Sequence, residues 1–505
     1  MVAVETEAKL VCGPDFVERE LLGWLARRGD VSGPVELQQQ DTYLDTRTDE
    51  LVAAGLAVRV RDSAGLRTVE LKPVPIERSL VLARSEFTCA LRPGEDAGER
   101  VRTWVAELFG LELGETPREV LTLTTTRRRF AVSIDGTAME LCVDHVRAAE
   151  PHARRASFHE LELELRSGDA AVLRELAVQL SKRAGLSASH RTKFERARAS
   201  LGLGEFRYGA KAPSPDADAL LVDAARAVIH AWWQTVLAHV PGVRVGLDPE
   251  HVHKMRVAMR RLRTALRVYE AAFDPEAGDD FRRRLRSFGR LLGQVRDYDV
   301  QREAIPAWRA AFVGIAAEAW ADVDDRLVRR RHRARLQVLQ AMRSEAWREL
   351  VVAAERCIAS AVPGLRHTVG AAAPGLVAAR VERCARAFAR LRDDGDAEDA
   401  HALRIEIKNL RYTVEFFAPV LGPHVEEPLR AVTELQDRLG EVQDGVQTGR
   451  LAGELLVMPP PPVAATAAAL GALVGHGHAM AQTARALGLA AADHVGLETA
   501  LAALR

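Results

Sequence analysis

Polar and apolar side chains alternate through the first third of the chain, and this alternation ends near residue 166. A period of two residues is typical of half-buried strands. It occurs in seven segments, at residues 4–10, 57–60, 68–72, 85–91, 129–134, 138–143 and 158–165. Helical patterns accompany them at residues 16–28, 99–108, 170–184 and 190–201. We therefore expect this part of the chain to combine antiparallel strands with flanking helices.

Residues 202–218 are rich in glycine and proline and are predicted to form a linker. Long segments rich in alanine, leucine and arginine follow, which indicates an all-helical region. Its predicted breaks are Pro241-Gly242, Pro275, Pro363-Gly364, Pro374-Gly375 and Pro459–Pro462. The predicted organisation is α+β, with a first domain at 1–201, the linker at 202–218 and a helical domain at 219–505.

The helical region contains a predicted internal repeat. HKMRVAMRRLRTALRVY at residues 253–269 matches HALRIEIKNLRYTVEFF at residues 401–417. Downstream, LGQVRDYDV at 292–300 matches LGEVQDGVQ at 439–447. Because both pairs keep nearly the same separation, we expect a duplicated helical bundle.

Each repeated segment, drawn as a helix of 3.6 residues per turn, has an apolar stripe and a basic face. The basic positions in the two copies are His253, Arg256, Arg260, Arg263 and Arg267, and His401, Arg404, Lys408 and Arg411. A bundle core needs the apolar stripe but does not need the basic face. Guanidinium groups bind phosphate oxygens in bidentate geometry, so such a row suits an extended polyanion. The alternative is an ordinary solvated charged face.

The whole chain has 70 basic and 70 acidic residues, so a case for anion binding must be local. Residues 253–296 hold 12 Lys and Arg against 5 Asp and Glu, whereas residues 401–444 hold 5 against 8. A nucleic-acid partner is the competing interpretation of the basic helices. It is disfavoured because few aromatic side chains are available nearby to stack on bases.

The repeated motifs resemble those of the CHAD family over roughly residues 218–505. The resemblance implies a helical bundle that binds inorganic polyphosphate through the basic positions named above. Lys254 stands where an acidic residue is expected, and Asn409 stands where a second base is common.

Charged residues also occupy alternate positions on the predicted strands of the first domain. Examples are Glu5, Glu7 and Lys9 on the first strand, and Glu160, Glu162 and Glu164 on the last. Alternate side chains lie on one face of a strand. Arginine and lysine can hold a triphosphate, and carboxylates hold Mg²⁺ or Mn²⁺. A sheet with one solvated charged face is the alternative.

The ordered segments VETEAKL, TYLDT, AVRVR, VELKP, RSEF, TTRRRF and HELELEL resemble the CYTH family of triphosphate tunnel metalloenzymes, over about residues 1–200. The resemblance implies an antiparallel β-tunnel and divalent-metal-dependent hydrolysis of a triphosphate. The implied metal ligands are Glu5, Glu7, Asp144, Glu160, Glu162 and Glu164. The implied triphosphate-binding residues are Lys9, Arg59, Arg61, Lys72, Arg84, Arg127, Arg129 and Lys193. Lys9 and Glu86 are the catalytic candidates, and His190 and Arg191 compete with Lys193 as the last phosphate ligand.

Inorganic triphosphate is the expected substrate, with Mg²⁺ or Mn²⁺ as cofactor and polyphosphate as a second ligand. Competing functions are a thiamine or nucleoside triphosphatase, an adenylyl cyclase, and a non-catalytic polyphosphate-binding or granule-targeting protein. The chain has no apolar run long enough to span a membrane, and its five scattered cysteines indicate free thiols. We therefore expect a cytoplasmic protein, which polyphosphate binding would bring to granules.

Overall fold

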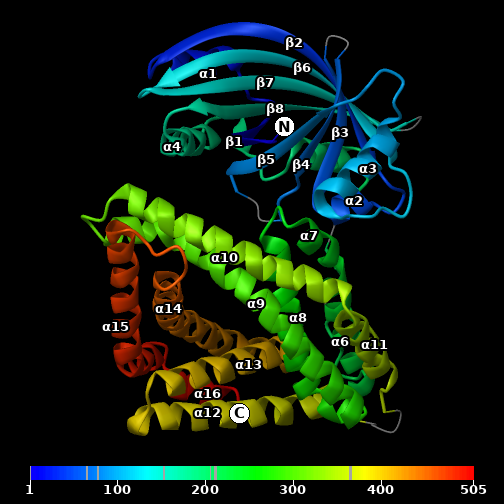
Figure 1. Cartoon of the computed structure of the whole chain (residues 1–505). Helices are drawn as coiled ribbons and strands as arrows, with labels where there is room; N and C mark the ends of the chain where they lie inside the picture. The colour runs from blue at the N-terminus through cyan, green and yellow to red at the C-terminus, as the bar shows by residue number, and fades with distance from the viewer. Residues whose placement is uncertain are drawn as a thin grey trace. The chain divides into compact units, whose positions relative to one another are not determined.

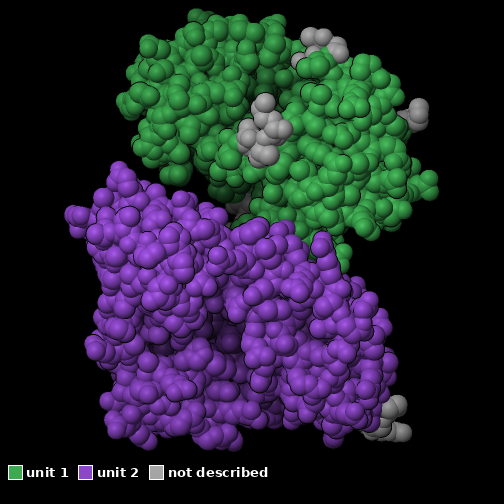
Figure 2. Space-filling model, viewed as in Figure 1, with its two compact units in different colours: residues 1–208, 238–251 green, residues 209–237, 252–505 purple. Residues whose placement is uncertain are grey.

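The computed structural model describes the chain except for residues 1, 64–65, 77–78, 152–153, 205, 207, 210–212 and 363–366. It divides into two compact units (Figure 2). Unit 1 comprises Met1–Tyr208 and Ala238–His251, and unit 2 comprises Gly209–Leu237 and Val252–Arg505. The described residues within the predicted linker 202–218 form no helix or strand. The predicted domain boundaries stay a prediction, and the predicted break at Pro363-Gly364 lies outside the described residues.

Unit 1 is built on a closed antiparallel barrel, which confirms the predicted tunnel (Figure 1). Its strands are β1 (Val2–Cys12), β2 (Asp30–Asp45), β3 (Leu56–Ser63), β4 (Leu66–Pro73), β5 (Val81–Ala90), β6 (Arg118–Ile134), β7 (Thr137–Ala149) and β8 (Arg155–Ser167). They follow the order β5-β4-β3-β2-β6-β7-β8-β1, and β1 also pairs with β5 to close the ring. The short β9 (Leu186–Ala188) pairs with β1.

Helices cover the outer face of the barrel because the strands direct apolar side chains outward there. Leu21 of α1 (Glu18–Leu25) and Leu173 of α4 (Ala170–Ser181) pack on Leu10 and Leu163 of the strands. Trp104 of α3 (Ala97–Phe109) and the short α2 (Glu50–Ala53) pack over β3 and β4. The residues that alternate with these apolar ones therefore face the tunnel.

One end of the barrel interior is filled by a further apolar cluster. Tyr43, Leu121, Leu123 and Val146 of the strands surround Phe194, which lies on α5 (Lys193–Ser200). Thr192 accepts a hydrogen bond from the Glu195 amide, and the Glu195 carboxylate accepts one from the Thr192 amide. This capping box fixes the start of α5 and so positions Lys193, its first residue.

Unit 2 is helical, as predicted, and long helices α9 and α10 run side by side in it (Figure 1). The helices from residue 221 onward are α6 (Leu221–Ala238), α7 (Val240–Val245), α8 (Glu250–Val268), α9 (Pro275–Ala311), α10 (Ala317–Arg343), α11 (Glu345–Ala359), α12 (Val369–Asp394), α13 (Ala397–Leu421), α14 (Glu426–Leu456), α15 (Ala464–His494) and α16 (Leu497–Ala503). Of these, α7 lies in unit 1.

One of the predicted helix breaks needs correction, because Pro374 lies within α12. Pro241 lies in the first turn of α7, so the chain is broken between the end of α6 at Ala238 and Val240. Proline fits the first turn of a helix because the amide it lacks has no partner there. Of the described helices, none has the length and apolar character needed to cross a membrane.

The two segments of the predicted repeat lie on α8 and α13, which contact each other. Thr264 donates a hydrogen bond of 3.3 Å to the side chain of Asn409. The Arg261 guanidinium lies 4.7 Å from the centre of the Tyr412 ring and 2.9 Å from Glu415. The duplication itself stays a prediction.

Candidate functional site

A cavity inside the barrel is lined mainly by charged side chains. Its lining residues are Glu5, Glu7, Lys9, Tyr43, Ala57, Arg59, Arg61, Glu70, Lys72, Arg84, Arg127, Glu162, Thr192, Lys193 and Phe194. Most of the predicted metal- and phosphate-binding residues of the first domain are therefore brought together. The inward-facing alternate positions of six strands and the first turn of α5 supply them.

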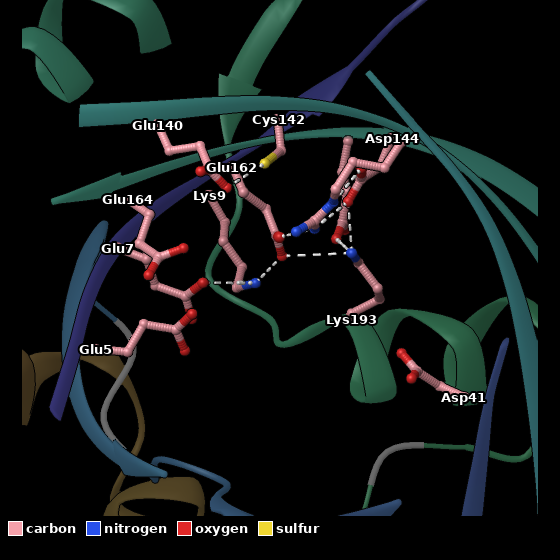
Figure 3. A network of polar contacts seen from close by, with 12 residues as sticks. Glu5, Glu7, Lys9, Asp41, Glu140, Cys142, Asp144, Glu162, Glu164 and Lys193 are labelled. Carbon is pink, nitrogen blue, oxygen red and sulfur yellow. Dashed lines mark hydrogen bonds and ion pairs between the residues drawn. The ribbon is translucent and has the colours of Figure 1, made fainter. Parts of the chain in front are cut away.

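Three carboxylates converge beside this cavity. Asp144, Glu160 and Glu162 each offer an oxygen, and these oxygens lie within 4.8 Å of one another. All three side chains are buried. Lys193 reaches this group from α5, with its Nζ 2.6 Å from Asp144 and 3.3 Å from Glu160 (Figure 3). All three are among the metal ligands that the family resemblance implies.

The carboxylates of this cluster do not share one environment. Burial raises the pKa of Glu160, although Lys193 opposes the rise. Burial also acts on Glu162, but Lys193, Lys9 and Arg127 outweigh it and hold the pKa of Glu162 well below its usual range. Glu160 Oε1 is buried and accepts no hydrogen bond from the described residues, although the Lys193 ammonium lies 3.3 Å from it. An all-oxygen donor set of buried carboxylates fits a hard divalent cation.

Lys9 and Arg84 lie among carboxylates on the β1 side of the cavity. Lys9 contacts Glu162 and lies 3.1 Å from Glu7, and Arg84 also contacts Glu7. Burial lowers the pKa of Lys9, but Glu162 and Glu7 outweigh it and raise the pKa above its ordinary value. Burial raises the pKa of Glu7, but Lys9 and Arg84 overcome it and bring the pKa to about 2. Both groups are therefore charged at neutral pH.

A third group of charges lies between Glu5 and Glu86. Lys72 Nζ is 2.5 Å from Glu5 and 3.4 Å from Glu86, and Arg59 is 3.9 Å from Glu86. Glu5 lines the cavity and Glu86 does not, and both lie outside the group of three carboxylates. Glu164 points toward Glu5 and Glu7 in Figure 3 but does not line the cavity. Burial and the charge of Glu5 raise the pKa of Glu164 to about 7.

Two carboxylates that the sequence analysis did not select hold the arginines of β3. Asp41 is 3.1 Å from Arg59 and 2.8 Å from Arg61, and Glu70 is 2.6 Å from Arg59. Burial opposes the charge on Asp41, but Arg59 and Arg61 lower its pKa to about 2. Asp41 alternates with Tyr43, and Glu70 alternates with Lys72. That period-two pattern was a signal that could have revealed both residues.

The predicted phosphate ligands are not equivalent in position. Arg127 contacts Glu162 and forms two hydrogen bonds to Asp144 at 2.8 and 2.6 Å. Arg129, two residues further along β6, does not line the cavity. Its side chain is 41% exposed and lies 3.8 Å from Glu140. Among the three candidates for the last phosphate ligand, Lys193 lines the cavity, Arg191 lines a neighbouring pocket and His190 is exposed.

Arg196 is a further cation near the acidic cluster. Its guanidinium is 2.9 Å from Glu160 and lies over the Phe158 ring. The sequence analysis did not select it, because its neighbourhood is crowded with basic residues and only the helical turn from Lys193 sets its direction.

In unit 2, the basic faces of α8 and α13 form one cluster of half-buried cations. Lys408 of α13 has its pKa lowered to about 7 by burial and by Arg260, Arg404, Arg263 and Arg256. Burial lowers the pKa of Arg404, with Arg260 contributing. Burial also lowers the pKa of His253 to about 4, with Arg296 and Arg260 contributing. Four arginines, one lysine and one histidine of the predicted site therefore lie within electrostatic reach of one another.

This basic cluster has few internal counter-ions. Within the described part of the chain, no carboxylate lies within 4.0 Å of the charged groups of Arg260, Arg263 or Lys408. The Nε atoms of Arg260, Arg263 and Arg404 are buried and donate no hydrogen bond to a described residue. Asp297 and Asp444 partly offset the burial of Arg256 and Arg404 respectively. Cations that are desolvated and unpaired favour an anionic ligand.

The ends of the predicted basic faces differ. Arg267 lies near Arg282 and Arg286 of α9 and Arg383 of α12, which extends the basic region. His401 Nδ1 donates a hydrogen bond of 2.8 Å to the side-chain oxygen of Gln443. Arg411 instead pairs with Glu415 at 2.8 Å, the carboxylate that also binds Arg261. Arg411 thus forms an ion pair with Glu415, one turn further along the same helix.

The charged tunnel and the basic helical bundle lie in two separate units of the chain. The family model of the CYTH domain matches residues 3–197, and that of the CHAD domain matches residues 227–452. The chain therefore contains a CYTH domain followed by a CHAD domain.

Several solved structures resemble parts of the chain. The CHAD domain from the plant Ricinus communis is 27% identical, covering 60% of this chain and 98% of its own, with a TM-score of 0.47. PptA from Streptomyces chartreusis is 22% identical, covering 54% and 98%, with a TM-score of 0.43. The Pct1 RNA triphosphatase of S. pombe is 15% identical, covering 35% and 75%, with a TM-score of 0.19. No curated protein sequence matches this chain.

Proposed function

We propose that the tunnel of unit 1 hydrolyses inorganic triphosphate to pyrophosphate and phosphate with a divalent cation. The observation that carries this proposal is the joint presence of converging buried carboxylates and seven cations around one cavity. A site that only bound anions would have no need of the carboxylates. A site that only bound a metal would have no need of so many cations.

Asp144, Glu160 and Glu162 are the residues proposed to hold the cation, with Glu5, Glu7 and Glu164 as further carboxylate candidates on the β1 side. Mg²⁺ or Mn²⁺, when bound there, polarises the phosphoryl oxygens and lowers the pKa of water. Lys193 donates a hydrogen bond of 2.6 Å to Asp144, so this ammonium would turn toward a phosphate once a divalent cation neutralises the carboxylates.

The cations lining the cavity orient the triphosphate and neutralise its charge. The proposed phosphate ligands are Lys9, Arg59, Arg61, Lys72, Arg84, Arg127 and Lys193. Most of them already contact a carboxylate within the tunnel, which fixes their side chains before substrate arrives. Such preorganisation stabilises charge developing in the transition state without a reorganisation cost. Arg129, which is exposed on the same strand as Arg127, is proposed to bind phosphate only outside the cavity.

Hydrolysis forms a bond from a water oxygen to a terminal phosphorus and breaks the bridging P–O bond to release pyrophosphate, and the proton lost by the water passes to solvent. Lys9 stays protonated because Glu162 and Glu7 raise its pKa, so it can neutralise charge on the departing pyrophosphate. Glu86, 3.4 Å from Lys72, is proposed to orient the water.

The basic cluster of α8 and α13 is proposed to bind inorganic polyphosphate. The supporting observation is that several of its half-buried cations lack carboxylate partners among the described residues. The binding residues are His253, Arg256, Arg260, Arg263, Arg267, His401, Arg404 and Lys408. Arg411 is the weakest member of this set because Glu415 already neutralises it.

Phosphate release from the full-length protein tests the enzymatic proposal. Inorganic triphosphate should be hydrolysed with Mg²⁺ or Mn²⁺, and EDTA should stop the reaction. Hydrolysis that continues at the same rate in EDTA would contradict it, as would the absence of hydrolysis with either cation. Direct binding of polyphosphate to the same preparation, measured by calorimetry, tests the second part.

A further inference from the structure

We propose that Phe194 is a specificity-determining residue of the tunnel. Its ring forms the wall between the charged cavity and a second, largely apolar pocket, and this wall excludes triphosphates that carry an aromatic group. The inference rests on the proposed triphosphatase function and adds to it the structural reason for an inorganic substrate.

Phe194 lines both spaces. On one side it borders the cavity that also contains Lys193 and Tyr43. On the other side it borders a pocket formed with Val52, Val74 and Tyr208. No other residue lines both spaces among the described parts of the chain. Removing this one side chain would therefore connect them.

The wall is fixed in place by its packing. The Phe194 ring stacks on Tyr43 with 4.7 Å between centroids and an interplanar angle of 22°. Both side chains are buried, with exposures of 3% and 4%, and they belong to the same apolar cluster inside the barrel. The capping box at Thr192 and Glu195 holds the backbone on either side of Phe194. A ring held this way cannot move aside without disrupting the end of the barrel.

The second pocket has the chemistry of a site for a flat organic ring. Phe206 and Tyr208 meet edge to face at 4.9 Å, and the Tyr208 hydroxyl donates a hydrogen bond to the Val52 carbonyl at 3.1 Å. Arg198 also lines the pocket, but its guanidinium binds Asp49 at 3.1 and 3.2 Å. Arg191 and Glu195, which are of opposite charge, also line the pocket. Aliphatic and aromatic walls with balanced charges suit a nucleobase better than another phosphate.

The two spaces together would fit a nucleoside triphosphate, with phosphates among the cations and the base among Phe206 and Tyr208. With Phe194 present, the base has no access to the apolar pocket and cannot contribute binding energy there. Inorganic triphosphate loses no binding energy in this way, because it needs only the charged cavity. The wall thus discriminates by denying a contact to the larger substrate.

The test compares Phe194→Ala with the unaltered full-length chain, with Mg²⁺ present. The measured quantity is the ratio of kcat/KM for ATP to kcat/KM for inorganic triphosphate. We expect the ratio to rise at least about tenfold, the range in which a new apolar contact discriminates substrates. Leu201→Ala is the matched control, since Leu201 belongs to the same apolar cluster but lines neither space. Its ratio should stay within about twofold of the unaltered value.

A ratio for Phe194→Ala that stays within twofold of the control would overturn the inference. Inorganic tetraphosphate is included to separate ring recognition from chain length, and an equal gain for it would also count against the inference. If Phe194→Ala shows no cooperative melting transition, Phe194→Leu is used, since leucine still lacks the flat ring. Calorimetric Kd values for ATP and triphosphate supply the same ratio if neither is hydrolysed. The absence of hydrolysis would refute the proposed catalysis, while the two Kd values would still test the role of Phe194.

Discussion

The ammonium of Lys193 lies 2.6 Å from the carboxylate of Asp144, and this contact joins α5 to the acidic cluster on β7 and β8. Lys193 is also 3.3 Å from Glu160 and 3.5 Å from Glu162, so one cation serves all three converging carboxylates. Binding of a divalent cation must therefore change the partners of Lys193 as well as those of the carboxylates. The first prediction follows from this arrangement.

Glu162→Gln should lower kcat for triphosphate by about 100-fold or more, the usual effect of removing a central electrostatic group. The amide keeps the shape of the side chain but removes the charge that Lys9, Arg127 and Lys193 neutralise. Phosphate release across Mg²⁺ concentrations should also show weaker activation by the cation. Glu107→Gln on the exposed face of α3 is the control. Near-normal turnover in Glu162→Gln would remove Glu162 from the proposed site.

Arg127→Ala should raise KM for triphosphate at least about tenfold, whereas Arg129→Ala should change it less than threefold. Arg127 lines the cavity and binds Asp144, but the Arg129 side chain is 41% exposed beside Glu140. The two variants remove the same group from the same strand, two residues apart. Equal losses would show that the phosphate chain extends to the exposed end of the barrel.

Glu164→Gln should stabilise the protein at pH 8 but have little effect at pH 5, when unfolding is followed in EDTA. The folded state raises the pKa of Glu164 from 4.5 to about 7. The folded protein therefore binds a proton more tightly than the unfolded chain, and its stability falls as pH rises from about 4.5 through 7. Removing the carboxylate should recover about 1 kcal/mol at pH 8, after allowance for partial exposure. An equal shift in Tm at both pH values would contradict this.

Polyphosphate affinity should fall as pH rises from 6.5 to 9, because Lys408 has its pKa lowered to about 7 in the free protein. An anionic ligand favours the charged ammonium, so binding takes up a proton above pH 7 and weakens as protons become scarce. Lys408→Arg should bind with little pH dependence over this range, since arginine stays protonated. A steep dependence that persists in Lys408→Arg would assign the titration to another group.

Arg260→Ala should weaken polyphosphate binding and make its dependence on salt shallower, by analogy with counterion release from nucleic acids. Arg260 belongs to the basic cluster and has no carboxylate within 4.0 Å among the described residues. Arg348→Ala removes an equal charge from an exposed ion pair with Glu345 and should have little effect. Arg261 is unsuitable as a control, because it binds Glu415 and packs on Tyr412. Equal effects at Arg260 and Arg348 would indicate diffuse attraction to surface charge.

Period-two alternation was sufficient to predict β1, β3, β4 and β8, because each carries charged residues inward and apolar residues outward. The strand β2 was missed, since Gly33-Pro34 interrupts the alternation of residues 31–37 and three successive glutamines follow it. Asp41 was missed with this strand, and although it alternates with Tyr43, its role depends on a register that places it opposite Arg61. Arg127 and Arg129 share a strand face, so only their positions along the tunnel separate them.

The closure of the barrel by β1 also determines when the cavity can form. Lys9 pairs in register with Glu162, and β1 pairs with both β5 and β8. The first strand of the barrel must therefore wait until residue 188 has emerged from the ribosome before its last partner, β9, is available. Contacts between residues so distant in sequence are formed slowly. The amino-terminal strand thus has a long interval during synthesis in which a chaperone, or another nascent chain, can bind its unpaired edge.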